Sequence, residues 1–158
     1  MSENKANRLA LIASHGTLDA AYMPLILGTA GAAMGMEVGI FFTFYGLEIL
    51  KKGEADKLQV SPIANPAMPM PVPNIVGVLP GMTAVATNMM HKWMGRANTA
   101  SLGELLEMAV DLDIKLIACQ MSMDVMGIAK EDLIDGIEVG GAATFLDFAS
   151  DNAISLAF

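Results

Sequence analysis

The stretch Lys115–Ile128 reads KLIACQMSMDVMGI, and it contains Cys119, the single cysteine of the chain. An apolar run ends at this cysteine, and a short methionine-rich segment follows it. The pattern predicts a buried β-strand over 115–118 and a helix that begins immediately after it. A strand that runs directly into a helix is typical of a parallel α/β fold.

Four further apolar segments have the length of short buried strands: residues 8–14, 36–44, 137–139 and 154–158. Helical patterns lie between the strands, at about 19–34, 45–52, 81–94, from Ser101 onward, and from 142 to about 150. Ser101 and Glu104 form a predicted capping box, and Asn152 is expected to end the last helix in a left-handed conformation. Pro24 either starts the main body of the first helix or kinks it. The alternation predicts five parallel strands with helices on both faces of the sheet.

Residues 57–80 are different, because they hold six of the seven prolines. Prolines at this density disfavour regular helix and most strand pairing, so we expect a long Pro/Met-rich loop. Two interpretations are open: the loop is a lid or binding element, or it is a surface loop without a function of its own. The apolar residues Ile75, Val76, Val78 and Leu79 favour partial packing of the loop.

The helical pattern over 81–94 carries an apolar stripe. Met82, Val85, Met89 and Trp93 recur at helical spacing and predict a face that packs into the core.

Composition limits the class of protein. The chain has 158 residues, enough for one domain with a real core, and we expect a single domain over 1–158. Its net charge of -8 and lack of a basic cluster argue against nucleic acid as a partner. One cysteine excludes an internal disulfide framework and fits a reducing compartment, and the amino terminus lacks the long apolar segment of a signal peptide. A cytoplasmic protein is therefore expected.

One segment, residues 20–46, is long and apolar enough to raise the question of a membrane span. Glu37 lies inside it without a basic residue nearby in sequence, and Pro24 and several glycines interrupt it. Small residues and leucine dominate its first half, whereas Val, Ile, Phe and Thr dominate the second. This change predicts a helix followed by a strand, and no contact with a membrane is expected.

Ligands of parallel α/β proteins collect beyond the carboxyl ends of the strands, and three segments are predicted to meet there. Cys119 is the candidate nucleophile, since the amide groups of a helix start would stabilise its thiolate and lower its pKa. The candidate binding residues around it are His15 and Gly16 after the first strand, Thr43 and Tyr45 after the second, and Gln120, Met121, Ser122 and Met123 after the third.

Simpler interpretations exist for the same residues. A free cysteine is often a small buried hydrophobe, and a lone histidine is more often structural than catalytic. His15, His91 and Cys119 match no known metal-ligand spacing, so no metal is predicted. No phosphate loop or dinucleotide motif is present, and no cofactor is expected.

The motif CQMSMDVMGI at 119–128 resembles the hallmark of the DsrE/DsrF-like sulfur-transfer family, in a branch often labelled peroxiredoxin-like and linked with heterodisulfide-reductase-like sulfur oxidation. Supporting similarity lies in SHGTLDAAYMPLILGTAGAAMGMEV, FFTFYGLEILKK, LPGM and GIEVGGAATFLDFA, so that it covers nearly the whole chain. The resemblance implies a three-layer α/β/α sandwich with a five-stranded parallel sheet. It also implies a homo-oligomer, a trimer or a multiple of it.

Function is implied by the same resemblance. Relatives carry sulfane sulfur on a cysteine that matches Cys119 and exchange it with TusA-type carrier proteins. Some relatives carry an extra membrane anchor, and we expect none in this chain because it begins and ends close to the predicted domain. Thiosulfate, a small persulfide and a rhodanese-bound persulfide all remain open as donors, as does the choice between a sulfurtransferase and a carrier that holds sulfur without accelerating its transfer. An oligomer with an incidental cysteine is the third interpretation. Because no second cysteine can resolve an adduct, a self-contained two-cysteine peroxidase is disfavoured.

Overall fold

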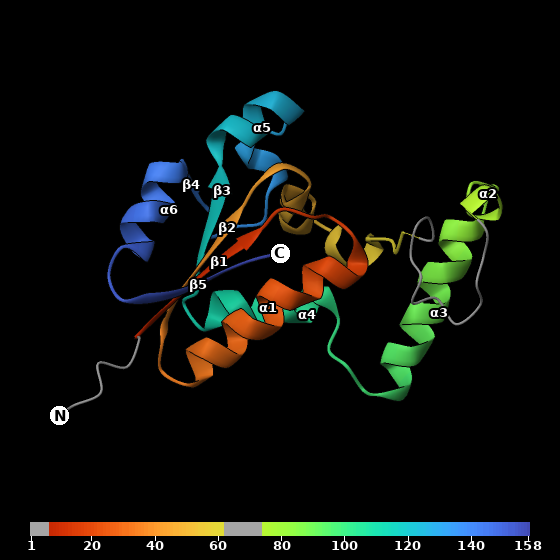
Figure 1. Cartoon of the computed structure of the whole chain (residues 1–158), viewed down its shortest axis with the longest axis horizontal. Helices are drawn as coiled ribbons and strands as arrows, with labels where there is room; N and C mark the ends of the chain where they lie inside the picture. Colours follow the sequence, from red (N-terminus) through yellow and green to blue (C-terminus); the bar gives the residue numbers. More distant parts are fainter. Residues whose placement is uncertain (1–6, 62–73) are drawn as a thin grey trace.

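The fold is built on one parallel sheet, seen in a computed structural model that describes residues 7–61 and 74–158 (Figure 1). The five strands are β1 (Arg8–Ala13), β2 (Glu37–Phe42), β3 (Lys115–Cys119), β4 (Glu138–Gly140) and β5 (Ala153–Ala157). Their order across the sheet is β4-β3-β2-β1-β5, and every neighbouring pair is parallel. The five-stranded parallel sheet predicted from the sequence is confirmed.

Helices cover both faces of the sheet. On one face lie α1 (Leu18–Ala33) and α4 (Leu102–Asp111), and on the other lies α6 (Ala142–Ala149). The remaining helices are α2 (Asn74–Gly77), α3 (Met82–Arg96) and α5 (Gln120–Met126), with 3₁₀ turns η1 (Phe44–Leu50), η2 (Ala55–Lys57) and η3 (Lys130–Asp132). The three layers agree with the expected sandwich.

Alternation along the strands divides the core in two, because successive side chains of a strand point to opposite faces. Leu9 and Leu11 of β1 belong to the large cluster beneath α1 and α4. Ala10 between them belongs to a smaller cluster that includes Phe145 and Phe148 of α6. Cys119 is part of the smaller cluster. Its side chain therefore has an apolar wall on the α6 side.

Local signals for the helix ends are largely confirmed. Ser101 caps α4 by accepting a bond from the Glu104 N–H at 3.2 Å, and the Glu104 carboxylate accepts from the Ser101 N–H at 2.7 Å. Asn152 has φ +49°, the left-handed conformation expected after the last helix. α1 begins six residues before Pro24, so the proline lies inside the helix and does not start it.

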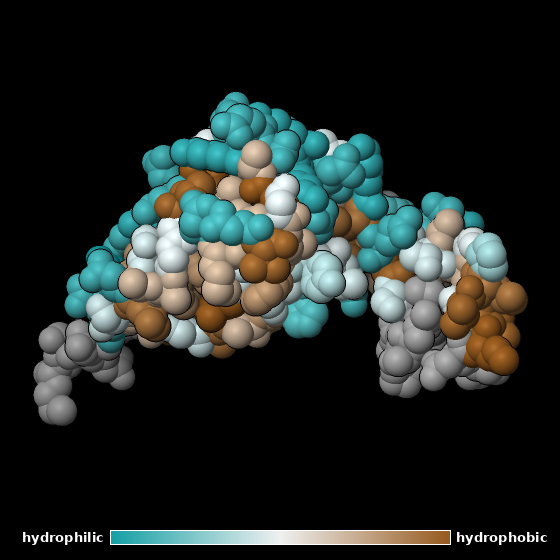
Figure 2. All heavy atoms as spheres, turned by 90° about the horizontal axis from the view of Figure 1, so that it is seen from above, coloured by the Kyte–Doolittle hydropathy of each residue, from teal (hydrophilic) through white to brown (hydrophobic). Residues whose placement is uncertain are grey.

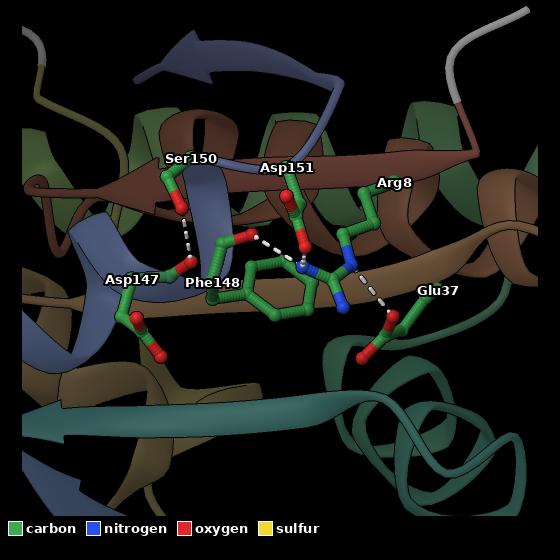
Figure 3. Close-up of polar contacts among 6 residues, drawn as sticks. All are labelled: Arg8, Glu37, Asp147, Phe148, Ser150 and Asp151. Carbon is green, nitrogen blue, oxygen red and sulfur yellow. Dashed lines mark hydrogen bonds and ion pairs between the residues drawn. The ribbon is translucent and has the colours of Figure 1, made fainter.

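The amino ends of the strands are tied together by Arg8 (Figure 3). Its guanidinium bonds Glu37 at the start of β2 at 2.7 Å and Asp151 before β5 at 3.3 Å. It also donates to the Phe148 carbonyl at 3.3 Å. Glu37 thus has a basic partner, Arg8, that lies 29 residues away in sequence and outside the apolar segment 20–46. Only the tertiary fold brings the two residues together.

The helices α2 and α3 extend away from the sheet, as Figure 1 shows. Ala86 and Thr87 are the buried residues of α3, and the Thr87 hydroxyl accepts a bond from the Val60 N–H at 3.1 Å. Val85 is 60% exposed and Trp93 is 41% exposed, so the prediction that this stripe packs into the core is wrong. A periodic apolar face shows which side needs a partner, but it does not show that the chain itself provides one.

The last seven residues of the predicted 57–80 loop, 74–80, also differ from expectation. It contains the short helix α2, and Ile75, Val78 and Leu79 are exposed, with only Val76 partly buried. Partial packing of all four residues against the chain is therefore wrong. Figure 2 shows apolar side chains gathered at this end of the molecule. Residues 62–73, where five of the six prolines lie, fall outside the described residues.

The suspicious segment 20–46 divides into α1 and β2, as its change of composition predicted. Among residues 7–61 and 74–158, none of the helices has both the length and the apolar character needed to cross a bilayer.

Candidate functional site

Three neighbouring strands deliver the candidate residues to one edge of the sheet. Cys119 is the last residue of β3, Thr43 follows β2 directly, and His15 comes two residues after β1. Because β2 lies between β1 and β3, the carboxyl ends of β1 and β3 are about 10 Å apart, two strand spacings. Thr43 is therefore placed to meet Cys119 directly, whereas His15 is one strand further away.

Cys119 combines an apolar wall with a set of hydrogen-bond donors. The residue is 5% exposed, and this burial by itself raises the pKa of the thiol. Hydrogen bonds to the sulfur from the Ser122 hydroxyl and N–H, the Thr43 hydroxyl and the Met121 N–H act in the opposite direction. Together they outweigh burial, and the pKa of Cys119 lies below its ordinary value. The thiolate is the reactive form of cysteine, so this environment favours reactivity.

The two hydroxyl groups around the sulfur are fixed by each other. Thr43 Oγ1 and Ser122 Oγ lie 2.9 Å apart, and Ser122 is fully buried. Ser122 lies in the first turn of α5, where backbone N–H groups have no partner within the helix and are free to point back at the preceding residues. The sequence step Cys119-Gln120-Met121-Ser122 thus brings both an amide and a hydroxyl group to the thiol.

A close approach of the backbone holds Thr43 in place. The Thr43 N–H donates to the Ala13 carbonyl at 3.0 Å, which ties the end of β2 to the end of β1. Three residues later, Gly46 packs so tightly against β1 that an added Cβ would collide with the same Ala13 carbonyl. Phe44 between them has φ +46°, a conformation that L-residues seldom adopt. The tight path of η1 therefore requires glycine at 46.

His15 and its neighbours line a hollow that does not include Cys119. A depression of about 260 Å³ is lined by His15, Gly16, Thr17, Tyr45 and Glu48. His15 is exposed, and its Nδ1 lies 3.0 Å from the Ser14 hydroxyl. The structure therefore brings together His15, Gly16 and Tyr45 in one place and Cys119, Thr43 and Ser122 in another. Sequence reasoning did not single out Glu48; its position one helical turn after Tyr45 was the available signal.

The other predicted residues of α5 have three different environments. Gln120 donates from Nε2 to the Asp124 carboxylate at 2.7 Å, on the surface of the helix. Met121 is 58% exposed beside the cysteine. Met123 is buried in the large core cluster, where it anchors α5.

Apolar side chains are exposed around this edge of the sheet. They belong to η1 and α5, which flank the thiol: Phe44, Tyr45, Met121 and Val125. Within the described ranges, no cluster of three or more His, Cys, Asp or Glu side chains is arranged to hold a metal ion. The site can therefore provide one nucleophilic thiol, next to an exposed apolar rim formed by Phe44, Tyr45, Met121 and Val125.

The fold and the site together define a class of protein: a parallel α/β sandwich with one cysteine thiol of lowered pKa at the carboxyl edge of its sheet. A family model described as the DsrE/DsrF/DrsH-like family matches residues 5–157. The chain belongs to this family.

Individual relatives agree with this assignment. The chain is 45% identical over 155 residues to the sulfur carrier protein DsrE2 of Allochromatium vinosum, covering 94% of this chain and 96% of that protein. It is 30% identical over 162 residues to the uncharacterized protein YrkE of Bacillus subtilis, covering 96% and 97%. The crystal structure of the ychN protein from E. coli shares the fold with a TM-score of 0.57 at 12% identity, over 96% of this chain and 99% of that one.

Proposed function

We propose that this chain is a sulfur-trafficking protein that accepts sulfane sulfur on Cys119 and passes it to a carrier protein. The observation that carries the proposal is the thiol of Cys119, which lies at the carboxyl edge of the sheet and receives hydrogen bonds from Ser122, Thr43 and Met121. Those donors favour an anionic sulfur over a neutral one. The 45% identical relative is named a sulfur carrier protein, which supports the same role.

The chemistry is exchange at sulfur and needs no external oxidant. With thiosulfate, the Cys119 thiolate attacks the outer sulfur, the S–S bond breaks, sulfite leaves, and a persulfide remains on Cys119. With tetrathionate, attack at an inner sulfur releases thiosulfate and leaves an S-thiosulfonate. With a small persulfide, the outer sulfur moves to Cys119 and the donor leaves as a thiolate.

Delivery reverses the first step. An acceptor thiolate attacks the outer sulfur of the Cys119 persulfide, and Cys119 leaves as the thiolate that its surroundings stabilise. No second cysteine exists in the chain, so the acceptor belongs to another molecule. We propose a TusA-type carrier protein or a rhodanese as the macromolecular partner, in the cytoplasm, where a free thiol stays reduced. The exposed apolar rim of Phe44, Tyr45, Met121 and Val125 is suited to contact with such a partner.

Two further parts of the proposal concern the oligomeric state and the hollow lined by His15 and Tyr45. The protein is a homo-oligomer, a trimer or a multiple of it. His15, Gly16 and Tyr45 bind no reacting sulfur atom in this scheme; their hollow lies beside the site and is available to the rest of a bulky donor.

Intact-mass analysis after incubation with thiosulfate, tetrathionate or polysulfide tests the proposal. The wild type should gain the mass of sulfur or thiosulfonate and lose it to an added carrier thiol. Cys119→Ser should gain nothing, because a hydroxyl is a poor nucleophile at neutral pH. If the wild type stays unmodified with all three donors, or if Cys119→Ser gains as much, the proposed function is wrong. Turnover with excess donor and acceptor then separates a sulfurtransferase from a carrier.

A further inference from the structure

His15 is held in one tautomer by the residues around it. The Ser14 hydroxyl donates to the Phe158 carbonyl at 2.7 Å, and the Ser14 N–H donates to the same carbonyl at 2.8 Å. A serine hydroxyl has one proton, so the Ser14 oxygen can only accept at its other contact, which lies 3.0 Å from His15 Nδ1. In the neutral form of His15, Nδ1 therefore carries the ring proton and Nε2 carries the free lone pair. This imidazole is prepared to accept a proton at Nε2.

Among the residues that line its hollow, His15 is the best proton acceptor. The Glu48 carboxylate is already bound to Lys51 Nζ at 2.7 Å. Thr17 and Tyr45 offer hydroxyl groups, which are weak bases at neutral pH. His15 is exposed, so a proton that it takes from a bound molecule can pass on to solvent.

The hollow and the thiol are joined by the short segment 43–45. Thr43 meets Ser122 beside the sulfur of Cys119, and Tyr45, two residues later, lines the hollow. Two residues of chain span at most about 7 Å, so the hollow begins close to the thiol. Gly16 fixes the other wall, because an added Cβ there would collide with the Tyr45 carbonyl oxygen. The loop that carries His15 therefore packs directly against the segment that carries Thr43.

The separation of His15 from Cys119 leaves room for one thiol between them. The carboxyl ends of β1 and β3 are about 10 Å apart. A sulfur bound to Cys119 lies about 2 Å beyond Sγ, and the sulfur of an attacking thiol lies about 3–3.5 Å beyond that. A hydrogen bond from this thiol to a ring nitrogen adds about 3–4 Å, which makes a line of about 9 Å. His15 is thus too distant to contact Cys119 but at the right distance to contact the thiol that takes the sulfur.

We propose that His15 is the general base of the delivery step, and that its Nε2 removes the proton of the acceptor thiol as this thiol attacks the sulfur held on Cys119. The S–H bond of the acceptor breaks, and its proton moves to Nε2. The acceptor sulfur forms a bond to the outer sulfur, the bond between that sulfur and Cys119 breaks, and its electron pair stays on Cys119 as the thiolate. The proton then leaves His15 for solvent. No external oxidant or reductant takes part.

Loading and delivery differ in their need for a base. Thiosulfate carries no thiol proton, and the Cys119 thiolate that attacks it is stabilised by its own hydrogen bonds. An acceptor thiol ordinarily keeps its proton at neutral pH, because the pKa of a free cysteine is about 8.5. A base therefore accelerates delivery and leaves loading unchanged. The inference rests on the delivery step of the proposed function and adds one contact to it, between His15 and the acceptor thiol.

Two acceptors that differ in ionisation test the base. The protein is loaded with polysulfide, desalted and mixed at pH 7 with 2-mercaptoethanol, which is almost wholly protonated, or with thionitrobenzoate, an aromatic thiol that is already ionised. Intact-mass analysis follows the loss of sulfur from Cys119. His15→Ala should slow delivery to 2-mercaptoethanol by about 10–100-fold and delivery to thionitrobenzoate by less than about twofold, because only the first acceptor needs a base. Added imidazole should restore the slowed reaction. His91→Ala, at an exposed histidine of α3, is the matched control and should behave as the wild type with both acceptors.

The same measurements separate failure of this role from failure of the proposed function. A wild type that takes up no sulfur would overturn both. If the wild type loads and His15→Ala delivers to 2-mercaptoethanol at the wild-type rate, His15 is not the base and the sulfur chemistry of Cys119 stands. An equal loss of rate with both acceptors, without rescue by imidazole, would show a structural effect of the substitution and would also overturn the role of His15.

Discussion

Thr43 and Ser122 are 79 residues apart in sequence, yet their hydroxyl oxygens lie 2.9 Å apart beside the sulfur of Cys119. Each hydroxyl group can donate one hydrogen bond and accept others. When one hydroxyl donates to the other, the second still has its own O–H, which can donate to the thiolate. The strand ends of β2 and β3 create this pair, and neither segment forms it alone.

The first prediction concerns the ionisation of Cys119. Because hydrogen bonds to the sulfur outweigh burial and lower the pKa of Cys119, the rate of alkylation should reach half its maximum at a lower pH than for a free thiol. Iodoacetamide labelling of the native protein between pH 5 and 10 measures it, with the urea-unfolded chain as the reference. A native midpoint at or above the unfolded one would remove the electrostatic basis of the site.

The same shift links ionisation to stability. A lower pKa in the folded state means that ionisation of Cys119 favours folding, and this contribution is fully present above the unfolded pKa of about 8.5. It decreases as pH falls through the native pKa. The free energy of unfolding of the wild type relative to Cys119→Ser should therefore rise between pH 6 and 9. A difference that stays constant, or falls, over this range would show that the thiol is not ionised preferentially in the native state.

Thr43→Val and Ser122→Ala test the hydroxyl pair. Each removes one hydroxyl group of the pair that donates to the sulfur, and each should raise the pKa of Cys119 and slow its alkylation at pH 7. Ser122→Ala should also cost about 1 kcal/mol of stability, the usual contribution of one hydrogen bond. Ser150→Ala, at the exposed serine that follows α6 near the amino ends of the strands, is the matched control and should leave the alkylation profile unchanged. Equal profiles for Ser122→Ala and Ser150→Ala would refute the role of the pair.

His15→Ala tests whether the hollow around His15 is separate from the loading reaction at Cys119. His15 lines the hollow with Tyr45 and Glu48, about two strand spacings from Cys119. The variant should fold and still load sulfur from thiosulfate, more slowly at most, because a thiolate that is already stabilised needs no strong base. Complete loss of loading in a folded His15→Ala protein would place the histidine in the reaction and unite the two places into one site.

Gly46→Ala tests the tight path that positions Thr43. The added Cβ would meet the backbone carbonyl of Ala13, which cannot move without disturbing β1, so a loss of about 1–3 kcal/mol is expected. Gly95→Ala is the control, because Gly95 lies in α3 with open space around it and should gain up to about 1 kcal/mol from better helix propensity. Urea unfolding of both variants measures the difference. A Gly46→Ala midpoint equal to that of the wild type would mean that η1 is free to shift.

Sequence patterns were sufficient for features that depend on neighbours along the chain. The third strand, predicted over 115–118 and observed to Cys119, the capping box of Ser101 and Glu104, and the left-handed Asn152 follow from short-range rules. Placing Cys119 and Thr43 at the same edge required the further rule that parallel strands end together.

Features that depend on distant contacts escaped prediction. The pairing of Arg8 with Glu37 and the separation of His15 from Cys119 both require the order of strands, which short-range periodicity does not contain. The spacing of Val85 and Trp93 predicted a face that packs into the core, but both side chains are exposed. Periodicity shows only that a helix face is apolar. Whether such a face meets the same chain or another is settled by packing, which lies beyond the pattern.

The pairing of β1 with β5 joins residue 8 to residue 153, nearly the two ends of the chain. During synthesis, β1 emerges first and has one side unpaired until the last strand has been made. We therefore expect the pairing of β5 with β1 to form late in folding, because loop-closure entropy makes such a long-range contact slow. A chain stalled or cleaved a few residues before its end would expose the apolar edge of β1, a template for aggregation. Removal of β5 should therefore increase aggregation through the freed edge of β1.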